Sequence, residues 1–334
     1  MNKILIAMTM FLPMASWAFT GEAVVEGINY YIVTKAKTAE VRAFPYSLEI
    51  SDIPKYKGNI VIPESIVYEG VECSVTSIGN AAFSSCNELN SVVIPNSVTA
   101  IGNNTFNHCS SLISLTIPNS VSSIGAFAFS SCSGLTSITI GESVTSIDED
   151  AFENCSSLTS LIIPNSVMTI GNQAFRGCSS LTSIMIGNGV IQIGMEAFEN
   201  CTSLTTLTIG GGVKKIFYHA FANCPELADV YCLAEEVPAT IYSDRFSSSV
   251  TDTFENSYIE YATLHVPSSS IEAYRSKAPW NGFKNIVEYV DPSGIQGVNL
   301  DKSVNTPAYD LNGRRLTKTA KGINIIGGKK VVVK

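Results

Sequence analysis

Charged residues are scarce in this chain of 334 residues, because Asp, Glu, Lys and Arg make up only 15% of it. The net charge is −8, whereas nucleic-acid binding needs clustered Lys and Arg that neutralise phosphates, so nucleic acid is excluded as a partner. Long hydrophobic runs are also missing. The longest, near the N-terminus, falls short of the about 20 residues that a membrane-spanning helix needs, which argues against an integral membrane protein.

Internal repetition is what the chain has in abundance. Four residue types recur with a step of 23 residues and form four columns. The columns are Cys86, Cys109, Cys132, Cys155, Cys178, Cys201 and Cys224; Phe83, Phe106, Phe129, Phe152, Phe175, Phe198 and Phe221; Ile78, Ile101, Ile124, Ile147, Ile170, Ile193 and Ile216; and Leu89, Leu112, Leu135, Leu158, Leu181, Leu204 and Leu227. A period of about 20 to 29 residues with an L-x-x-L-x-L core is typical of leucine-rich repeats, whose coils bury their apolar faces by stacking. The sequence therefore predicts an α/β leucine-rich-repeat solenoid with short parallel strands on its concave face.

Five segments divide the chain. Residues 1–18 combine a basic start at Lys3, an apolar run and small residues before Phe19, which is typical of a signal peptide for export. We expect a β cap at 19–57, the solenoid at 58–233, an irregular last repeat with a C-terminal cap at 234–290, and a β tail at 291–334. Export would place the protein outside the cell or on its outer surface.

Three irregular stretches carry their own expectations. The alternation between Val24 and Tyr31 predicts a hairpin. About nine residues around Tyr68-Glu69-Gly70 are inserted into the repeat pattern and predict a loop or hairpin. Residues Ser269 to Glu272 resemble a capping box that opens a short helix through Tyr274.

The nine cysteines are an odd number, so they cannot all pair. Equivalent side chains on stacked coils point the same way, which is unfavourable for a bridge. We therefore predict that the seven-cysteine column packs as buried thiols. Cys232 occupies a position held by Ile209 one coil earlier and should be buried too, whereas Cys73 is out of register and is expected to be the exposed thiol.

The candidate binding site is the set of outward residues on the repeat strands. Apolar positions of each strand face inward, so the intervening side chains face the concave surface. They are Ser114, Thr116, Ser137, Thr139, Ser160, Ile162, Ser183, Met185, Thr206, Thr208 and Tyr231. His265 aligns with Thr116 and would extend this ribbon of hydroxyls. The ribbon suits a broad contact with a protein or a glycan, although an exposed sheet face also tolerates Ser and Thr without any function.

Catalysis has little support. Only three histidines exist, and His108 and His219 lie nearly five coils apart, about 23 Å at the strand spacing. That separation is too long for a shared proton relay. We therefore predict a protein that is not an enzyme and that has no catalytic residues and no cofactor.

Acidic residues recur along one edge of the coils. They are Asp148, Glu149, Asp150, Glu153, Glu196 and Glu199. Their oxygens are the ligands that Ca²⁺ prefers, but their spacing is not that of a calcium-binding loop. We interpret them as a solvated acidic edge and predict no metal site.

The repeat unit resembles a known family. Its pattern I-G-x-x-A-F-x-x-C-x-x-L-x-x-L-x-I is present at Ile170-Gly171, Ala174-Phe175, Cys178, Leu181, Ile184 and Ile186. This pattern is similar to the BspA-like (Treponema pallidum-type) leucine-rich repeat of bacterial surface proteins, and seven consecutive copies cover about half of the chain. The resemblance implies a secreted or cell-surface protein that adheres to host extracellular matrix proteins or to other cells, and it brings no catalytic residues.

The tail resembles the C-terminal sorting signal of type IX secretion in Bacteroidetes. The matching residues are Asp310 to Arg314, Lys321 to Ile323 and Gly328 to Lys330. Asn312-Gly313 and Gly327-Gly328 are two-residue turns that predict two hairpins. At about 40 residues the tail is shorter than the usual signal, so a terminal β cap stays an alternative.

These observations lead to one functional prediction and one alternative. We expect a non-catalytic adhesion or protein–protein interaction module that binds a host extracellular matrix or cell-surface protein through the ribbon. The alternative is a glycan-binding surface protein that captures nutrients with the same hydroxyls and Tyr231.

Overall fold

The structure is a computed structural model that describes residues 20–43, 56–241 and 252–290, together with four strands of the tail. The chain divides into two compact units, Met1–Val287 and Glu288–Lys334. The expected signal peptide lies outside the described residues. The larger unit is a parallel β-solenoid of about nine turns with ~23-residue repeats and little helix, which confirms the predicted fold class.

An antiparallel hairpin begins the larger unit and covers the first coil. Strands β1 (Thr20–Val25), β2 (Ile28–Val33) and β3 (Thr38–Arg42) pair in sequence, and β3 pairs in parallel with β6 (Val71–Ile78). The inserted residues form a second hairpin, because β5 (Ser65–Tyr68) pairs antiparallel with β6. Both expected hairpins are therefore present.

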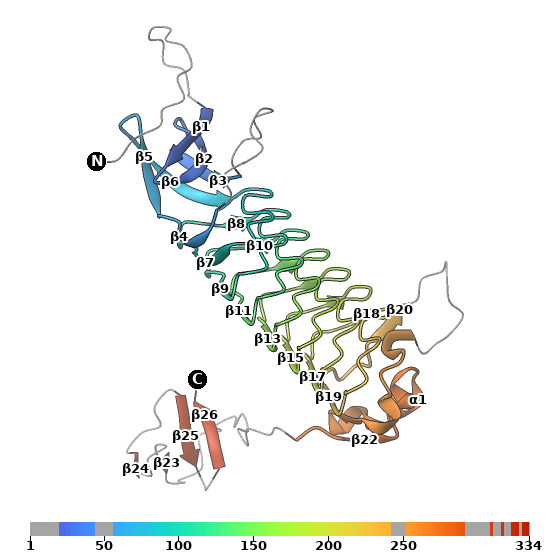
Figure 1. Ribbon diagram of the computed structural model, residues 1–334. Helices are drawn as coiled ribbons and strands as arrows, with labels where there is room; N and C mark the ends of the chain where they lie inside the picture. The colour runs from blue at the N-terminus through green and yellow to red at the C-terminus, as the bar shows by residue number, and fades with distance from the viewer. Residues whose placement is uncertain are drawn as a thin grey trace. The chain divides into compact units, whose positions relative to one another are not determined.

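Two ladders of parallel strands run along the solenoid (Figure 1). The first continues from β6 and consists of very short strands. They are β8 (Ala100–Ile101), β10 (Ser123–Ile124), β12 (Ser146–Ile147), β14 (Thr169–Ile170), β16 (Gln192–Ile193), β18 (Lys215–Phe217) and β20 (Ala239–Ile241). We predicted the Ile column of this ladder as core but not as strands, because two residues per coil are too few to show a strand period.

The second ladder contains the longer strands that the repeat pattern predicts. They are β4 (Gly58–Val61), β7 (Leu89–Val93), β9 (Ser114–Thr116), β11 (Ser137–Thr139), β13 (Ser160–Ile163), β15 (Ser183–Ile186), β17 (Thr206–Ile209), β19 (Asp229–Cys232) and β21 (Thr263–Val266). They divide into three sheets, β4 with β7, β9 with β11, and β13 through β21, and the last sheet also contains β22 (Asn285–Glu288), which the repeat pattern does not predict. Each pairing that includes two repeat strands has equivalent residues opposite each other, such as Leu161 opposite Ile184 and Leu207 opposite Val230. Outward side chains therefore form straight columns along the solenoid.

Stacked phenylalanines fill the space between the two ladders. The seven rings of the Phe column are buried, and neighbouring ring centroids lie 4.9 to 5.4 Å apart. Tyr56 covers the first ring and Phe254 covers the last. Because adjacent coils are identical at this position, each ring meets a ring of the same shape and leaves no void.

The thiols pack beside the rings. All nine cysteines are free and buried, as predicted for the column and for Cys232. Each thiol from Cys109 to Cys224 donates a hydrogen bond to the carbonyl oxygen of the Phe in the preceding coil, for example Cys109 Sγ to Phe83 at 3.0 Å. Burial raises the pKa of Cys132 and Cys178 to about 12, so these thiols stay protonated.

Our prediction that Cys73 is exposed was wrong. Its side chain is buried, because the β5–β6 hairpin places Cys73 opposite Ile66 on the inward side of the pair. Cys73 is out of register with the repeat, as the sequence indicates. The β5–β6 hairpin nevertheless shields it from solvent, which the repeat coils alone would not do.

The part of each coil between the short strand and the long strand consists of turns and contains no helix in the described repeats. One position of these turns is left-handed in successive coils, with φ of 59° at Ser85, 60° at His108, 59° at Ser131 and 56° at Asn154. Asn and Gly tolerate this conformation best, and later coils use Gly177, Asn200 and Asn223 there.

A short irregular segment closes the C-terminal end. It contains the 3₁₀ turns η1 (Asp252–Phe254), η2 (Ile259–Tyr261), η3 (Ser268–Ser270) and η4 (Trp280–Gly282), and the helix α1 (Ile271–Ser276). The helix was predicted, but its capping box was wrong, because Ser270 makes no cap and donates instead to the Glu235 carbonyl at 2.6 Å. Buried Tyr274 and Trp280 seal the last coil.

The smaller unit is a four-stranded antiparallel sheet. Its strands are β23 (Ala308–Tyr309), β24 (Arg315–Leu316), β25 (Gly322–Ile326) and β26 (Lys329–Val333). The order is β24-β23-β25-β26, and β25 and β26 form a hairpin across residues 327–328. The tail is thus a β unit, as its turn residues predict.

Candidate functional site

The predicted site residues come together as two outward columns of the second ladder, which we call the ribbon. One column runs through Val61, Val93, Thr116, Thr139, Ile162, Met185, Thr208, Tyr231 and His265. The other runs through Asn59, Ser91, Ser114, Ser137, Ser160, Ser183, Thr206, Asp229 and Thr263. Strand pairing within two separate sheets, β9 with β11 and β13 through β21, aligns the eleven predicted residues, and the 23-residue repeat relates the two sheets. Pairing of β19 with β21 places His265 next to Tyr231 as expected.

The hydroxyls of the ribbon differ from those of the neighbouring column. Eight ribbon hydroxyls, from Ser114 to Thr208, make no side-chain hydrogen bond to any described residue. Immediately before β11, β13, β15 and β17, a threonine hydroxyl donates to the backbone of the preceding coil, such as Thr182 to the Thr159 carbonyl and Thr205 to the Thr182 carbonyl, both at 3.0 Å. The neighbouring column therefore holds coils together, whereas the ribbon presents free donors and acceptors to solvent.

Apolar side chains interrupt the hydroxyls at two places. Ile162 and Met185 are 66% and 53% exposed and lie side by side on β13 and β15. Val61 and Val93 are 66% and 55% exposed and pair on β4 and β7. Our candidate site omitted the second pair, although both valines hold the same register as Thr116.

An aromatic pair ends the ribbon. The rings of Tyr231 and His265 stack with centroids 4.3 Å apart, and His265 Nε2 lies 2.9 Å from Asp229 Oδ1. One face of Tyr231 is therefore covered by the imidazole. This geometry removes half of the platform that the alternative of glycan binding to the ribbon assigned to Tyr231.

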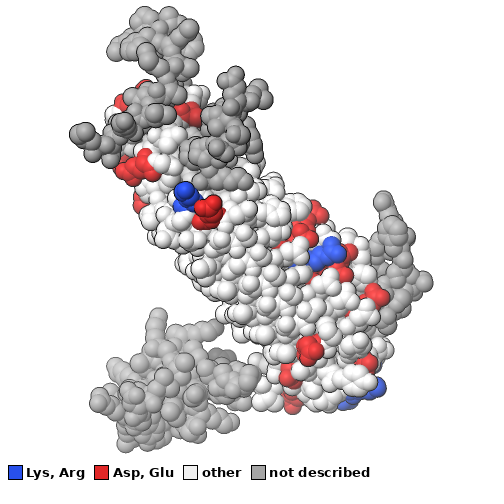
Figure 2. Space-filling view, in the orientation of Figure 1, with Lys and Arg blue, Asp and Glu red and all other residues white. Residues whose placement is uncertain are grey.

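Charge is almost absent from the ribbon. From Asn59 to Thr208 none of its positions carries Asp, Glu, Lys or Arg, and Asp229 is its one charged residue. Figure 2 shows the same scarcity over a wide area in the middle of the solenoid, with charged side chains toward its ends and along one side. A partner of the ribbon must therefore be recognised by shape, apolar contact and neutral hydrogen bonds.

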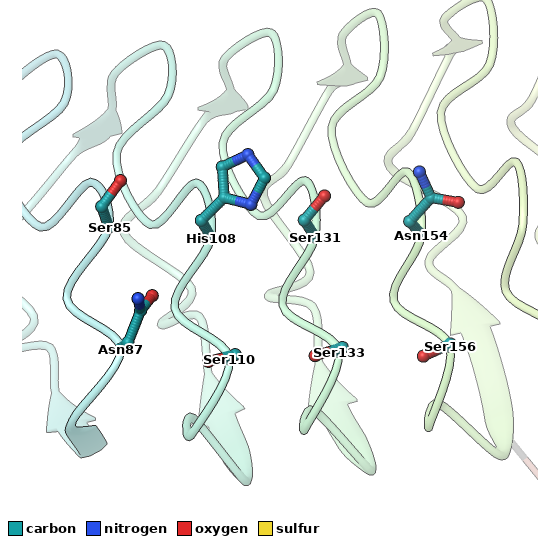
Figure 3. Close-up of a pocket in the computed structure, with 8 residues that line it drawn as sticks. All are labelled: Ser85, Asn87, His108, Ser110, Ser131, Ser133, Asn154 and Ser156. Atoms are coloured by element: carbon teal, nitrogen blue, oxygen red, sulfur yellow. The ribbon is translucent and has the colours of Figure 1, made fainter.

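A shallow groove of about 550 Å³ lies beside the first strands of the ribbon (Figure 3). Two rows of side chains from four successive coils line it. One row is Ser85, His108, Ser131 and Asn154, and the other is Asn87, Ser110, Ser133 and Ser156. None of these side chains has a hydrogen-bond partner among the described residues. Sequence reasoning missed the groove, because its only signal is a run of polar residues on either side of the buried cysteines.

The acidic edge is not simply solvated, and this interpretation needs correction. Arg176 pairs with Glu199 at 2.9 Å and with Glu196 at 3.6 Å, and Gln173 donates to Glu196 at 2.6 Å. Asp150 is only 5% exposed. Stacking brings residues of three successive coils together here, and the spacing of residues within one coil does not show it.

Catalytic or metal-binding geometry does not emerge in the part of the chain that the structure describes. The histidines stand apart: His108 lines the groove, His219 contacts Glu255 at 2.8 Å, and His265 contacts Asp229. Within residues 20–43, 56–241 and 252–290 no group of His, Cys, Asp and Glu is arranged to hold a metal ion. The same residues contain no helix that is long and apolar enough to cross a membrane.

Two solved structures of bacterial leucine-rich repeat proteins are similar to this chain. A leucine-rich repeat protein from Bacteroides ovatus is 21% identical, with a TM-score of 0.54 over 79% of this chain and 78% of that chain. The Treponema pallidum leucine-rich repeat protein is 28% identical, with a TM-score of 0.53 over 62% of this chain and 91% of that chain. No curated protein matches the chain.

The family model for the BspA-type leucine-rich repeat region matches six copies over residues 64–178 and 145–274, which is more than half of the chain. Solenoids of this kind are typically non-catalytic scaffolds that bind other proteins. The chain belongs to the BspA-type leucine-rich repeat family of bacterial proteins.

Proposed function

We propose that this protein is an exported, non-catalytic adhesion module that binds a host extracellular matrix or cell-surface protein through the ribbon. The observation that carries the proposal is the exposed pair Ile162 and Met185 among hydroxyls that have no partner within the described residues. Apolar groups rimmed by polar ones are typical of protein–protein interaction sites. The family supports an interaction module of this kind.

The ribbon is suited to a protein more than to a charged polymer. Burying an exposed apolar side chain against a partner contributes about 25 cal/mol of binding free energy per Å² removed from water. Because Ile162 and Met185 are adjacent, this contribution is concentrated at one place on the ribbon. The uncharged flanks supply hydrogen bonds without the desolvation cost of ions. Affinity for the partner should therefore centre on β13 and β15.

Export and surface display belong to the same proposal. The N-terminal signal peptide would direct the chain out of the cytoplasm, and the tail would act as a type IX sorting signal in a member of the Bacteroidetes. The β hairpin formed by β25 and β26 is compatible with such a signal. Removing residues 305–334 should abolish surface display, and unchanged display would leave the tail as a β cap.

Glycan binding is the second candidate function. The groove of Figure 3 is a better site for a glycan than the ribbon is. Its two neutral rows advance by one coil at a time, so an extended polysaccharide lying along the solenoid could meet the same hydrogen-bonding groups at each step. Asn and Ser side chains both donate and accept, as sugar hydroxyls do.

Binding of the purified chain to parallel arrays of matrix proteins and glycans separates the two candidates. The ribbon variant carries Ile162→Asp and Met185→Asp, and the groove variant carries Ser110→Arg and Ser133→Arg. Met168→Asp with Ile191→Asp is the matched control, because these side chains are 49% and 45% exposed beside β14 and β16, outside the ribbon.

Saturable protein binding that is lost only in the ribbon variant would establish the adhesin. Glycan binding that is lost only in the groove variant would favour the second candidate. Equal loss in the ribbon variant and its control would show that binding does not use the ribbon.

A further inference from the structure

Two acidic pairs occupy the same place in coils that lie two repeats apart. In the later coil the pair is Glu196 and Glu199, and in the earlier coil it is Asp150 and Glu153. The first residue of each pair has the same left-handed backbone, with φ of 54° at Glu196 and 53° at Asp150. The repeat thus presents one arrangement of two carboxylates twice.

The later pair has three donor side chains within reach. Arg176 pairs with both of its carboxylates, Gln173 donates to Glu196, and Asn223 Nδ2 donates to Glu199 at 3.2 Å. Arg176 and Gln173 come from the preceding coil and Asn223 from the following one. In the later coil, the two carboxylates therefore hold one guanidinium group and two amide side chains.

The earlier pair lacks all three donors. The positions two coils before Gln173, Arg176 and Asn223 are Phe127, Ser130 and Gly177. A phenyl ring and a glycine donate nothing from a side chain. Ser130 Oγ lies 3.3 Å from Glu153 Oε2, where Arg176 meets the equivalent Glu199, but it brings no charge.

Asp150 is left with an unbalanced charge. Its side chain is 5% exposed and makes no hydrogen bond or ion pair to any described residue. Burial is the main cause that raises its pKa to about 6, and Glu153 and Glu149 on its own coil raise it further. From the next coils Arg176 lowers the pKa and Glu196 raises it, and the ion pairs of Arg176 are with the later pair.

We propose that Asp150 and Glu153, with Glu149 beside them, form a binding site for the guanidinium group of an arginine on a protein partner. The planar guanidinium presents several donors at once and bridges two carboxylates, as Arg176 does within the chain. A metal ion does not fit, because the described residues form no metal-holding group. Figure 2 shows acidic and basic side chains close together along one side of the solenoid.

This site is separate from the ribbon and does not rest on the function proposed for it. The acidic pair lies in the turns of its coil, whereas the ribbon residues lie on strand β13. A partner that contacts both would be oriented by its arginine, because a charged pair with fixed geometry sets register as well as affinity.

Nuclear magnetic resonance titration of the whole chain with a blocked Gly-Arg-Gly peptide tests the proposal, with Gly-norleucine-Gly as the uncharged comparison. We expect saturable shifts of the Asp150 and Glu153 side chains with the arginine peptide alone. Protons compete with the guanidinium for Asp150, so affinity should rise between about pH 5 and pH 7. Asp150→Asn with Glu153→Gln should weaken binding about tenfold and remove this pH dependence.

Two further variants make the test specific. Asp148→Asn changes an exposed carboxylate on the same coil and should leave affinity within about twofold. Ser130→Arg restores the missing arginine within the chain and should block the peptide. Equal loss in Asp148→Asn and in the Asp150/Glu153 variant would overturn the proposal, as would unchanged binding in a folded Ser130→Arg or no response to the arginine peptide. If Ser130→Arg does not fold, the two carboxylate variants still decide.

Discussion

The interior of the solenoid and its outward surfaces differ in how strictly they repeat. Phe, Cys, Leu and Ile return at the same inward positions in seven coils, and all of these side chains are buried. The outward columns change from coil to coil, for example from Thr139 to Ile162 and Met185 along the ribbon. An inward side chain must match identical neighbours above and below, whereas an outward one meets only solvent or a partner.

This difference separates stability from recognition. Inward uniformity gives each coil the same stacking energy, as expected of a one-dimensional array. Outward variation creates local sites on the uniform scaffold, namely the ribbon, the groove and the acidic pairs. Substitutions inside should therefore cost stability, and substitutions outside should change binding or titration.

The largest effect is expected from the interior. Phe152→Ala should lower the free energy of unfolding by about 3 to 5 kcal/mol, because it leaves a cavity between two stacked rings. Ile162→Ala, on the ribbon, should cost no more than about 0.5 kcal/mol. Denaturant titration followed by circular dichroism measures both, and comparable losses would contradict the division between inward and outward columns.

Binding should show the reverse order. Ile162→Ala combined with Met185→Ala should weaken the complex with the protein ligand about tenfold, or about 1.4 kcal/mol, because the pair is the apolar centre of the ribbon. Met168→Ala with Ile191→Ala should change affinity by less than about twofold. Surface plasmon resonance gives the affinities, and similar losses in the two variants would remove the special role of β13 and β15.

A smaller effect is expected at Asp150, and it depends on pH. Its pKa in the folded chain is about 6, above the 3.8 of a free carboxyl, so ionisation costs stability as the pH rises from about 4 to 6. Asp150→Asn should therefore stabilise the protein by about 1 kcal/mol at about pH 7.5, a gain reduced by solvent at the edge of the site.

The stabilisation should shrink as the pH falls and vanish below about pH 3, where Asp150 is protonated in both folded and unfolded chains. Asp148→Asn, which changes an exposed carboxylate of the same coil, is the matched control. Unfolding midpoints at the two pH values decide, and a constant difference for Asp150→Asn would mean that its carboxyl titrates normally.

The smallest effect should distinguish two adjacent hydroxyls. Thr182→Val removes a hydrogen bond to the Thr159 carbonyl and should cost about 0.5 to 1 kcal/mol. Ser183→Ala removes a ribbon hydroxyl with no partner within the described residues and should be neutral within about 0.3 kcal/mol. Equal costs in chemical denaturation would show that the ribbon hydroxyls also hold the coils together.

Much of the fold follows from the repeat itself. The four inward columns predict the stacking, the long strands and the buried thiols, because a side chain at a fixed place in each coil must meet its copies. The first ladder escaped prediction, since pairs such as Ser146-Ile147 are too short to show alternation. The groove was not predicted either, because polar residues in turn positions line it, and polar residues are common in turns of any kind.

The candidate site was predictable in part. Alternation along the strands identifies the outward residues, and the structure aligns them in two columns that run through successive sheets. The sequence could not reveal that the Thr182 hydroxyl donates to a backbone carbonyl whereas the Ser183 hydroxyl makes no hydrogen bond to a described residue. That distinction depends on the neighbouring coil. Nor could the sequence show His265 covering one face of Tyr231, since the two residues are separated by a stretch without the repeat pattern.

Sequence alone determined the solenoid, its period, its inward columns and the family, because a strict repeat admits one way of burying its apolar side chains. Tertiary structure decided what the surface offers. Whether Cys73 is covered, whether a hydroxyl is free, and whether Asp150 has a cationic partner all depend on contacts between coils. Such contacts join residues that are distant in sequence, and only the stacking of coils brings them within reach.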